Sequence, residues 1–366
     1  MSSTMAIKST GQWTLPSQTG LAALRYDPNG TKSEQDLGPD DVLVEVRAAS
    51  LNYRDLTVTQ GPLTSSFPIS IIPSVIPGSD GSGRILAVGS AVATARPDLK
   101  PGADVVTHMC PDIADGVLPG IDEINNGLGG MTHGTLCRRG IFRYDALVLK
   151  PSNLSYAQAA TLTCSGLTAW NALMGCKGRE VKEGDWVLVQ GTGGVSIAAL
   201  QIAVAAGANV IATTSSDAKA ERLQALGASH VLNYRITPEW GEKAKALTPN
   251  SRGVDNVIDV VGPLTLLESL KAVRRDGLIT LTGLVGGVAN EGRTPIDIMG
   301  ALFHLCVVRG ILLGTRNMLR EMVGFVEEKN IQIAIDDDKF SLEEAKSAYE
   351  RLKSQKHFSK VIIGMD

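Results

Sequence analysis

Short apolar runs separated by Pro- and Gly-rich turns occupy the chain up to about residue 155. Val42, Val44 and Val46 alternate with other residues in DDVLVEVRA, and the runs GSGRILAVG, ADVVTH and DALVLKP have the same character. A period of two predicts strands with one buried face. The polar, Gly-rich segment 110–133 has no clear period and is predicted to be a surface lobe. This part is therefore predicted to be a β-rich domain with long loops.

After residue 155 the predicted strands alternate with predicted helices. The strands are 186–190, 209–214, 230–234, 254–262, 278–283 and 307–314, and the helices are 195–206, 217–226 and 263–275. Repeated strand, helix, strand units predict a parallel, doubly wound sheet. The tail adds a helix at 317–329, a short strand IQIAI, a helix at 342–352 and a closing strand KVIIG. We expect this tail to pack on the β-rich domain, which gives a discontinuous catalytic domain (1–154 and 315–366) around a dinucleotide-binding domain (155–314).

Composition excludes several classes of protein. Hydrophobic residues make up 43% and charged residues 20%, while 35 Lys plus Arg balance 38 Asp plus Glu. The absence of a basic cluster argues against nucleic-acid binding. The most apolar run, 197–212, contains Gln201, Gly207 and Asn209 and is too mixed to span a membrane. Without an apolar leader or a cysteine framework, the chain is predicted to be soluble and cytoplasmic.

A glycine-rich turn joins the strand at 186–190 to the helix that follows it. Gly191 permits a tight turn, while Gly193 and Gly194 let the backbone approach a pyrophosphate without a Cβ in the way. The free N–H groups and the dipole at the helix start, near Val195, favour an anion. Ser196 stands where the usual fingerprint has its last glycine. The turn predicts dinucleotide binding by Gly191, Gly193, Gly194 and Val195.

The residues after the next strand favour NADPH. NAD binding would call for a carboxylate about 20 residues after the glycines. The side chains found there are mostly hydroxyls and cations, namely Thr213, Thr214, Ser215, Ser216, Lys219, Tyr234 and Arg235. Such groups suit a 2′-phosphate. Two alternatives stay open: Asp217 is displaced by a residue or two and binds the ribose, or Lys219 is an exposed helix residue paired with Asp217 or Glu221.

Five segments in a fixed order resemble the medium-chain dehydrogenase/reductase superfamily. They are SLNYRD (50–55), PGSDGSG (77–83), AATLTCSGLTAW (159–170), the glycine turn and the closing KHFSKVII (356–363). The resemblance covers nearly the whole chain. In detail it is most similar to the zinc-independent branch, which contains quinone and enone oxidoreductases. The resemblance implies a GroES-like catalytic domain and a Rossmann domain.

The resemblance also shows which zinc ligands have been replaced. Zinc-dependent members bind the catalytic metal through a cysteine, a histidine and a second cysteine or an acid. The corresponding positions here are Asn52, Ser79 with Asp80 beside it, and Cys164. The four-cysteine structural lobe is reduced to Cys110. A tetrahedral zinc site needs several nitrogen or sulfur ligands, so no bound metal is expected.

Loss of the metal favours some hydride acceptors over others. Without a Lewis acid, reduction of a simple ketone would create a strongly basic alkoxide. Reduction of a quinone, or conjugate reduction of an enone, creates a delocalised anion that hydrogen-bond donors can stabilise. We therefore expect hydride transfer from NADPH to a quinone or an activated C=C bond of a small molecule. The alternatives are an NADP(H)-linked ketone or aldehyde reductase, and an NADPH-binding sensor or scaffold with little catalysis.

The resemblance places Asn52 and Tyr53 at the floor of the active site. The Tyr53 hydroxyl either donates a hydrogen bond or a proton to the developing oxyanion, or packs on the nicotinamide. Asn52 would hold the nicotinamide ribose or the substrate oxygen. Arg54 and Asp55 are predicted to form an ion pair that fixes the loop. Thr168 falls where the family's helix faces the nicotinamide ring.

Further candidates follow the last strands of the parallel sheet. Gly283, Leu284, Gly314 and Arg316 lie near the carboxyl ends of strands, where ligands bind in open α/β sheets. The alternative for the glycines is an ordinary turn. The strand at 307–313 is apolar on both faces and comes last in the sheet. In this superfamily the equivalent strand often pairs across a dimer axis, and such an edge needs cover, so a homodimer is expected.

Overall fold

Two compact units make up the chain, and the computed structural model describes residues 10–61, 69–283 and 299–365. The first unit extends to Cys164 and resumes at Thr315, and the second is Ser165–Gly314. The first boundary thus follows Cys164 and not residue 154. Helix α4 (Tyr156–Ala159) and the turn after it belong to the first unit because Ser82 Oγ donates to the Tyr156 carbonyl (2.6 Å) and Ser50 Oγ to the Ala160 carbonyl (3.1 Å).

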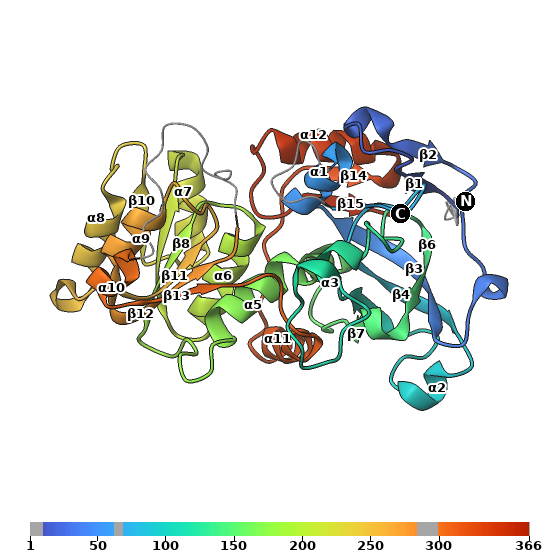
Figure 1. The fold of residues 1–366 in the computed structure, drawn as a ribbon, viewed down its shortest axis with the longest axis horizontal. Helices are drawn as coiled ribbons and strands as arrows, with labels where there is room; N and C mark the ends of the chain where they lie inside the picture. The colour runs from blue at the N-terminus through green and yellow to red at the C-terminus, as the bar shows by residue number, and fades with distance from the viewer. Residues whose placement is uncertain (1–9, 62–68, 284–298, 366) are drawn as a thin grey trace, which may run out of the picture. The chain divides into compact units, whose positions relative to one another are not determined.

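A mostly antiparallel sheet organises the first unit (Figure 1). Its strands run in the order β14-β15-β3-β4-β5-β7, and β6 pairs with β3. Their bounds are β3 Asp41–Ser50, β4 Asp80–Val88, β5 Asp104–Thr107, β6 Arg139–Arg143, β7 Leu147–Leu149, β14 Lys339–Ser341 and β15 Ile362–Gly364. Pairing of Ile362 with Ser50 joins the tail to the centre of the sheet. The expected β-rich fold of this unit is confirmed, and its strands come from two separate segments of the chain.

Short elements surround this sheet. They are the ribbon β1 Gln12–Thr14 with β2 Arg25–Asp27, and the helices α1 Tyr53–Gln60, α2 Val92–Ala95, α3 Ile121–Asn126, α11 Arg316–Glu328 and α12 Ala345–Lys353. Trp13, Val44, Leu136 and Tyr349 are among the buried side chains of one continuous core. Residues from both sequence segments of the unit therefore share a single hydrophobic core.

The predicted strand IQIAI is wrong, because residues 331–335 form no strand. Ile331 and Ile333 are buried, which explains the alternating pattern. The carbonyl groups here instead accept hydrogen bonds from side chains: Gln158 Nε2 donates to Ile333 (3.2 Å) and Ser359 Oγ to Ala334 (2.7 Å). The alternating pattern indicated buried side chains correctly, but this segment pairs with no neighbouring strand.

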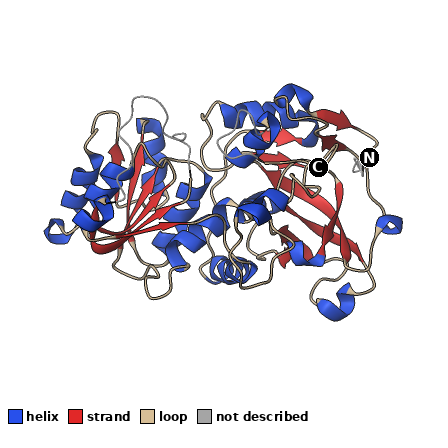
Figure 2. Cartoon of the chain, viewed as in Figure 1, coloured by secondary structure: helices blue, strands red, loops and turns tan. Residues whose placement is uncertain are grey.

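A six-stranded parallel sheet forms the second unit, in the order β10-β9-β8-β11-β12-β13, and helices flank it (Figure 2). The strands are β8 Trp186–Gln190, β9 Asn209–Thr214, β10 His230–Asn233, β11 Val254–Asp259, β12 Val273–Leu281 and β13 Val307–Gly310. The helices are α5 Ser165–Met174, α6 Gly194–Ala205, α7 Asp217–Ala225, α8 Trp240–Leu247, α9 Leu266–Ala272 and α10 Gly300–His304. The predicted Rossmann architecture is confirmed.

Several details of this unit differ from the sequence prediction. Strand β12 already begins at Val273, although residues 263–275 were predicted to form a helix, and helix α10 was not predicted. Helix α8 was not predicted, although Trp240, Ala244 and Leu247 have helical spacing. Trp240 and Ala244 belong to the core, and Leu247 packs against it. The predicted strand 307–314 is shorter, since β13 ends at Gly310, but it does lie at the edge of the sheet. Within the described ranges, no helix has the length and apolar character that crossing a bilayer requires.

Candidate active site

The glycine turn of the second unit presents open backbone. Gly191 has φ +76°, and its N–H donates to the Thr213 carbonyl at 3.0 Å, which ties the turn to β9. Gly193 caps α6 and Gly194 is its first residue. A Cβ added at Gly191 or Gly193 would meet no atom within 4 Å. Because the first N–H groups of a helix have no intrahelical acceptor, the start of α6 can bind an anion in this space.

Ser196 has a structural role beside the turn. It is buried in α6, and its Oγ donates to the Gln190 carbonyl at 2.6 Å. The bond joins the end of β8 to the first turn of α6. Val195, one residue earlier, is half-buried at the start of the helix. The residues present therefore fit a dinucleotide pyrophosphate at Gly191, Gly193, Gly194 and Val195.

The glycines after the later strands have a different environment. A Cβ at Gly283 would lie 2.5 Å from the Val260 carbonyl oxygen, and one at Gly314 would lie 2.8 Å from Leu167 Cδ1. Both glycines allow close packing of neighbouring segments. Thr168 follows Leu167 in α5 and is buried. Leu284 lies outside the described residues.

The residues expected at a 2′-phosphate gather where β9 meets α7. Ser215 and Lys219 are half-buried, and Ser216 is the N-cap residue of α7. The Ser216 N–H donates to Thr214 Oγ1 at 3.3 Å. The Tyr234 N–H donates to the Thr214 carbonyl at 3.0 Å, and the Tyr234 side chain is exposed. Two strand ends thus bring these residues together.

Asp217 is the alternative ribose ligand, and its carboxylate has a partner within the unit. Asn233 Nδ2 donates to Asp217 Oδ1 at 2.9 Å. Asn233 is the last residue of β10, so this bond holds the start of α7 against the neighbouring strand. One oxygen of the Asp217 carboxylate therefore already accepts a hydrogen bond within the unit.

A buried polar cluster lies where β3, α1, β4 and the segment before β15 meet in the first unit. We define the polar cluster as Ser50, Asn52, Asp55, Ser79, Asp80 and Lys360. Asn52 caps α1, and its Nδ2 donates to Ser79 Oγ at 3.3 Å. Its backbone N–H donates to Asp55 Oδ2 at 2.7 Å. The cluster thus holds the expected Asn52 but adds partners that the sequence did not reveal.

Lys360 is the cation of the polar cluster. Its side chain is 4% exposed, and its Nζ donates to Asp80 Oδ2 (3.2 Å) and to Asn52 Oδ1. Asp80 is fully buried and also accepts from Ser50 Oγ (3.1 Å) and Ser79 Oγ (3.0 Å). Sequence reasoning missed Lys360, which is separated from Asp80 by 280 positions and from Asn52 by 308.

The neighbours of Asn52 on α1 behave differently from the prediction. Arg54 and Asp55 form no ion pair; Arg54 donates to the carbonyls of Leu128 (2.9 Å) and Ile124 (3.1 Å). Burial raises the pKa of Asp55 to about 6, and the hydrogen bond from the Asn52 backbone opposes that rise. Tyr53 is 55% exposed at the start of α1. Its side chain is therefore exposed and lies outside the buried polar cluster.

The residues at the family's zinc positions do not fit a zinc site. The Lys360 ammonium points at the same oxygen atoms of Asn52 and Asp80 that a metal would need. These positions offer a single sulfur ligand, Cys164, whereas a tetrahedral zinc site needs several nitrogen or sulfur ligands. Among the described residues, no three His, Cys, Asp or Glu side chains are grouped so as to hold a metal ion.

Arg316 departs from the expectation that it binds the cofactor. It belongs to the first unit, at the start of α11, and is 3% exposed. Its guanidinium donates to the Asp115 carboxylate and to the carbonyls of Pro111 (3.1 Å) and Ile113 (2.9 Å). The side chain therefore fixes the 110–133 lobe to α11.

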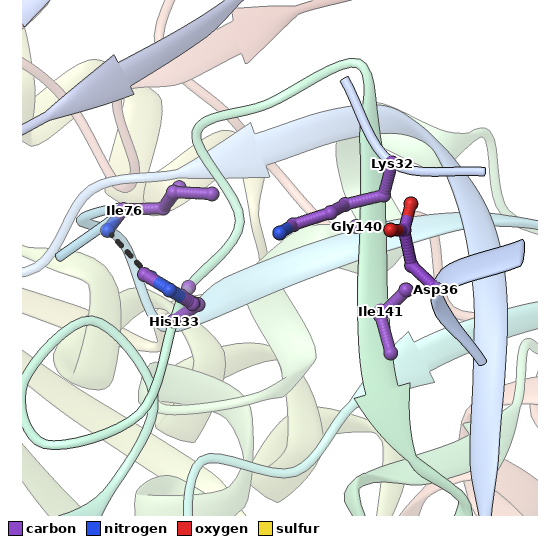
Figure 3. A pocket seen from close by; sticks show the side chains of 7 residues that line it. Lys32, Asp36, Ile76, His133, Gly140 and Ile141 are labelled. Carbon is purple, nitrogen blue, oxygen red and sulfur yellow. Dashed lines mark hydrogen bonds between the residues drawn. The ribbon is translucent and has the colours of Figure 1, made fainter. Parts of the chain in front are cut away.

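A cavity of about 200 Å³ also opens in the first unit (Figure 3). Lys32, Asp36, Ile76 and His133 are among its lining residues. The His133 ring accepts a hydrogen bond from the Ile76 N–H at 3.1 Å through Nδ1, which marks it as a packing histidine. The lining shares no residue with the polar cluster, so this cavity is separate from the candidate site.

Comparison with known proteins agrees with these two units. The family model of the alcohol dehydrogenase GroES-like domain matches residues 38–152, and that of the zinc-binding dehydrogenases matches residues 194–328. A zinc-type alcohol dehydrogenase-like protein of Schizosaccharomyces pombe is 41% identical over 342 residues, which are 93% of this chain and 95% of that protein.

Solved structures show the same relationship. A putative alcohol dehydrogenase of Sinorhizobium meliloti superposes with a TM-score of 0.84 at 35% identity, covering 97% of this chain and 99% of that one. An NAD-dependent alcohol dehydrogenase superposes with a TM-score of 0.80 at 30% identity and the same coverage. These names do not separate a quinone- or enone-reducing branch from carbonyl-reducing relatives. The chain is an oxidoreductase-type protein that belongs to the medium-chain dehydrogenase/reductase superfamily.

Proposed function

We propose that this protein is a zinc-independent, NADPH-dependent oxidoreductase that transfers a hydride to a quinone or to the activated C=C bond of an enone or enal. The observation that carries the proposal is the buried contact of Lys360 with Asn52 and Asp80. A fixed ammonium supplies positive charge without the Lewis acidity of a metal ion. Such a site suits acceptors whose reduced form is a delocalised anion.

The cofactor half of the proposal rests on the second unit. NADPH, when bound, supplies a hydride from C4 of its nicotinamide. The N–H groups at Gly193, Gly194 and Val195 would hold the pyrophosphate. Ser215, Ser216, Lys219 and Tyr234 would surround the 2′-phosphate, since Asp217 is bonded to Asn233. Thr168, Gly283, Leu284 and Gly314 stay as proposed contacts to the rest of the cofactor.

The substrate half rests on Asn52 and Tyr53. The Asn52 amide has two N–H groups, of which one is directed to Ser79 Oγ, so one is left for a substrate oxygen. The hydroxyl of the exposed Tyr53 is the proposed donor to the oxygen that gains negative charge. Two such donors would stabilise an enolate or a hydroquinone anion.

The test is consumption of NADPH by chelator-treated protein offered an enone, a quinone and a saturated aldehyde side by side. Turnover of the enone or quinone alone is the expected result. Tyr53→Phe should lower the maximal rate and leave NADPH affinity unchanged. Turnover of the aldehyde at a comparable rate would contradict the proposal.

A second candidate is reduction of a ketone or aldehyde, and the names of the relatives favour it. Its distinguishing result is aldehyde turnover that survives chelation. Strong NADPH binding with no turnover of any acceptor would instead favour a sensor or scaffold. A preference for NADH over NADPH would contradict the NADPH part of the proposal and would match the NAD-dependent alcohol dehydrogenase among the similar structures.

We propose a homodimer formed through the β13 edge. Exposed apolar side chains gather close to that edge in the sequence: Leu302 (58%), Phe303 (76%), Leu305 (56%) and Leu312 (38%). An uncovered apolar strand edge promotes association, so we propose that a second copy of the chain covers the β13 edge. All five cysteines are free thiols, which suits the reducing cytoplasm as the proposed location.

A further inference from the structure

We propose that Lys360 is a built-in cation that takes the place of a metal ion in the polar cluster, excludes divalent metals from it and fixes the orientation of the Asn52 amide. Metal exclusion does not depend on the catalytic proposal. The positioning role rests on the proposed function, because it acts on Asn52.

The hydrogen bonds of the Lys360 ammonium are the first observation behind this proposal. Lys360 Nζ donates to one oxygen of Asp80 and to the side-chain oxygen of Asn52, and all three side chains are at least nine-tenths buried. A divalent cation at this place would need the same oxygen atoms as ligands. It would also lie beside a buried positive charge. The lysine and the metal therefore compete for one site.

The balance of charges within the polar cluster is the second observation behind this proposal. The Lys360 ammonium neutralises the Asp80 carboxylate in a region that water does not reach. Breaking such a pair leaves an uncompensated buried charge, which is strongly unfavourable. The other carboxylate of the cluster, Asp55, is bonded to the Asn52 backbone. A metal dication would add two positive charges beside an ammonium that already neutralises Asp80.

The backbone before β15 holds Lys360 in place. Ser359 has φ +62°, a left-handed conformation that costs a serine energy. Its Oγ donates to the Ala334 carbonyl at 2.7 Å. The Leu51 N–H donates to the Val361 carbonyl at 3.0 Å, which anchors this segment beside Asn52. The neighbouring contacts over-determine the strained residue and so direct Lys360 into the cluster.

The consequence for Asn52 follows from donor chemistry. An ammonium can only donate, so the Asn52 oxygen must face Lys360 and the NH₂ group must face the other way. Nδ2 accordingly donates to Ser79. Lys360 thereby decides which end of the amide meets the substrate. It is a positioning residue that acts through Asn52.

Zinc titration of metal-free protein tests the exclusion directly. Wild type should bind no zinc at this site, so its zinc uptake should equal that of Cys164→Ser. Lys360→Met removes the charge but keeps an unbranched apolar chain, and it should raise zinc affinity by about tenfold or more. The gain should disappear in Lys360→Met/Cys164→Ser. Lys353→Met, at an exposed position of α12, should behave like wild type.

Two results would overturn the exclusion: stoichiometric zinc in wild type that is lost in Cys164→Ser, or a Lys360→Met variant with unchanged zinc affinity. The wild-type and Cys164→Ser comparison can still refute the exclusion even where Lys360→Met does not fold. Neither measurement uses turnover, so a failure of the catalytic proposal stays distinguishable from a failure of this one.

Kinetics test the positioning role. Lys360→Met should lower kcat by about tenfold or more with little change in the KM for NADPH, as expected when a transition-state donor loses its orientation. Lys360→Arg, which keeps the charge and the donors, should recover part of kcat. Equal rates in Lys360→Met and wild type would show that Asn52 does not depend on Lys360.

Discussion

The glycine turn and the polar cluster are built in opposite ways. The turn uses consecutive residues, Gly191 to Ser196, and presents backbone towards open space. The cluster joins Asn52, Asp80 and Lys360 across most of the chain and buries charge among side chains. Binding by the turn should therefore be sensitive above all to added bulk, whereas the cluster should respond to charge above all.

The largest effect is expected from removal of charge in the cluster. Asp80→Asn leaves the buried Lys360 ammonium without its carboxylate and should reduce the free energy of unfolding by about 3 kcal/mol. Urea denaturation measures this change. Asp104→Asn is the matched control, because Asp104 pairs with the exposed Arg84 and should lose about 1 kcal/mol or less. Equal losses of free energy of unfolding in the two variants would show that the buried pair contributes no more to stability than the exposed one.

Added bulk at the turn should act on binding and spare stability. Gly193→Val puts a side chain into the space proposed for the pyrophosphate and should weaken NADPH binding about hundredfold, or about 2.7 kcal/mol. Fluorescence titration gives the affinity, and thermal denaturation should show a small change. Gly324→Ala, whose Cβ also meets no atom within 4 Å, is the control in α11. Unchanged affinity in Gly193→Val would place the cofactor elsewhere.

A smaller effect should separate the two nicotinamide cofactors. Lys219→Ala removes the cation proposed for the 2′-phosphate, so NADPH affinity should fall about tenfold while NADH affinity stays nearly constant. Parallel titrations with both cofactors measure the ratio. An equal loss for NADPH and NADH would exclude Lys219 from the 2′-phosphate site.

The smallest effect concerns pH and the cluster carboxylate Asp55. Burial raises its pKa from 3.8 to about 6, so between these values the folded protein binds more protons than the unfolded chain. Wild type should therefore gain stability relative to Asp55→Asn as the pH falls through 6, by about 1 kcal/mol near pH 5. Denaturation of both proteins at pH 7 and pH 5 tests this. Parallel pH dependences would assign the carboxyl an ordinary pKa.

Local features were predictable from the sequence, and contacts between distant segments were not. The strand before Gly191 and the strand 209–214 were predicted with their observed bounds, because apolar runs and glycines identify them locally. Helix α8 could have been found from the spacing of Trp240, Ala244 and Leu247. The residues of IQIAI alternate as strand residues do, yet no pattern within them specifies the missing partner strand.

The candidate site divides in the same manner. Asn52 and Tyr53 were recognised through the resemblance to a family. Lys360 was not, because a lysine before an apolar strand reads as an ordinary solvated residue until Asp80 is seen beside it. Arg54 was assigned to its sequence neighbour Asp55, whereas its partners are carbonyls 70 and 74 positions away. The identity of an ion pair depends on tertiary packing that local spacing does not encode.

The place of Lys360 after the second unit in the sequence orders events during synthesis. A ribosome translates the whole of the second unit, Ser165–Gly314, before it reaches this lysine. The second unit can therefore fold while translation continues, but Asp80 must wait for its counter-ion until residue 360 emerges. A message truncated before codon 360 would yield a protein with a complete second unit and an unneutralised Asp80 carboxylate in the first.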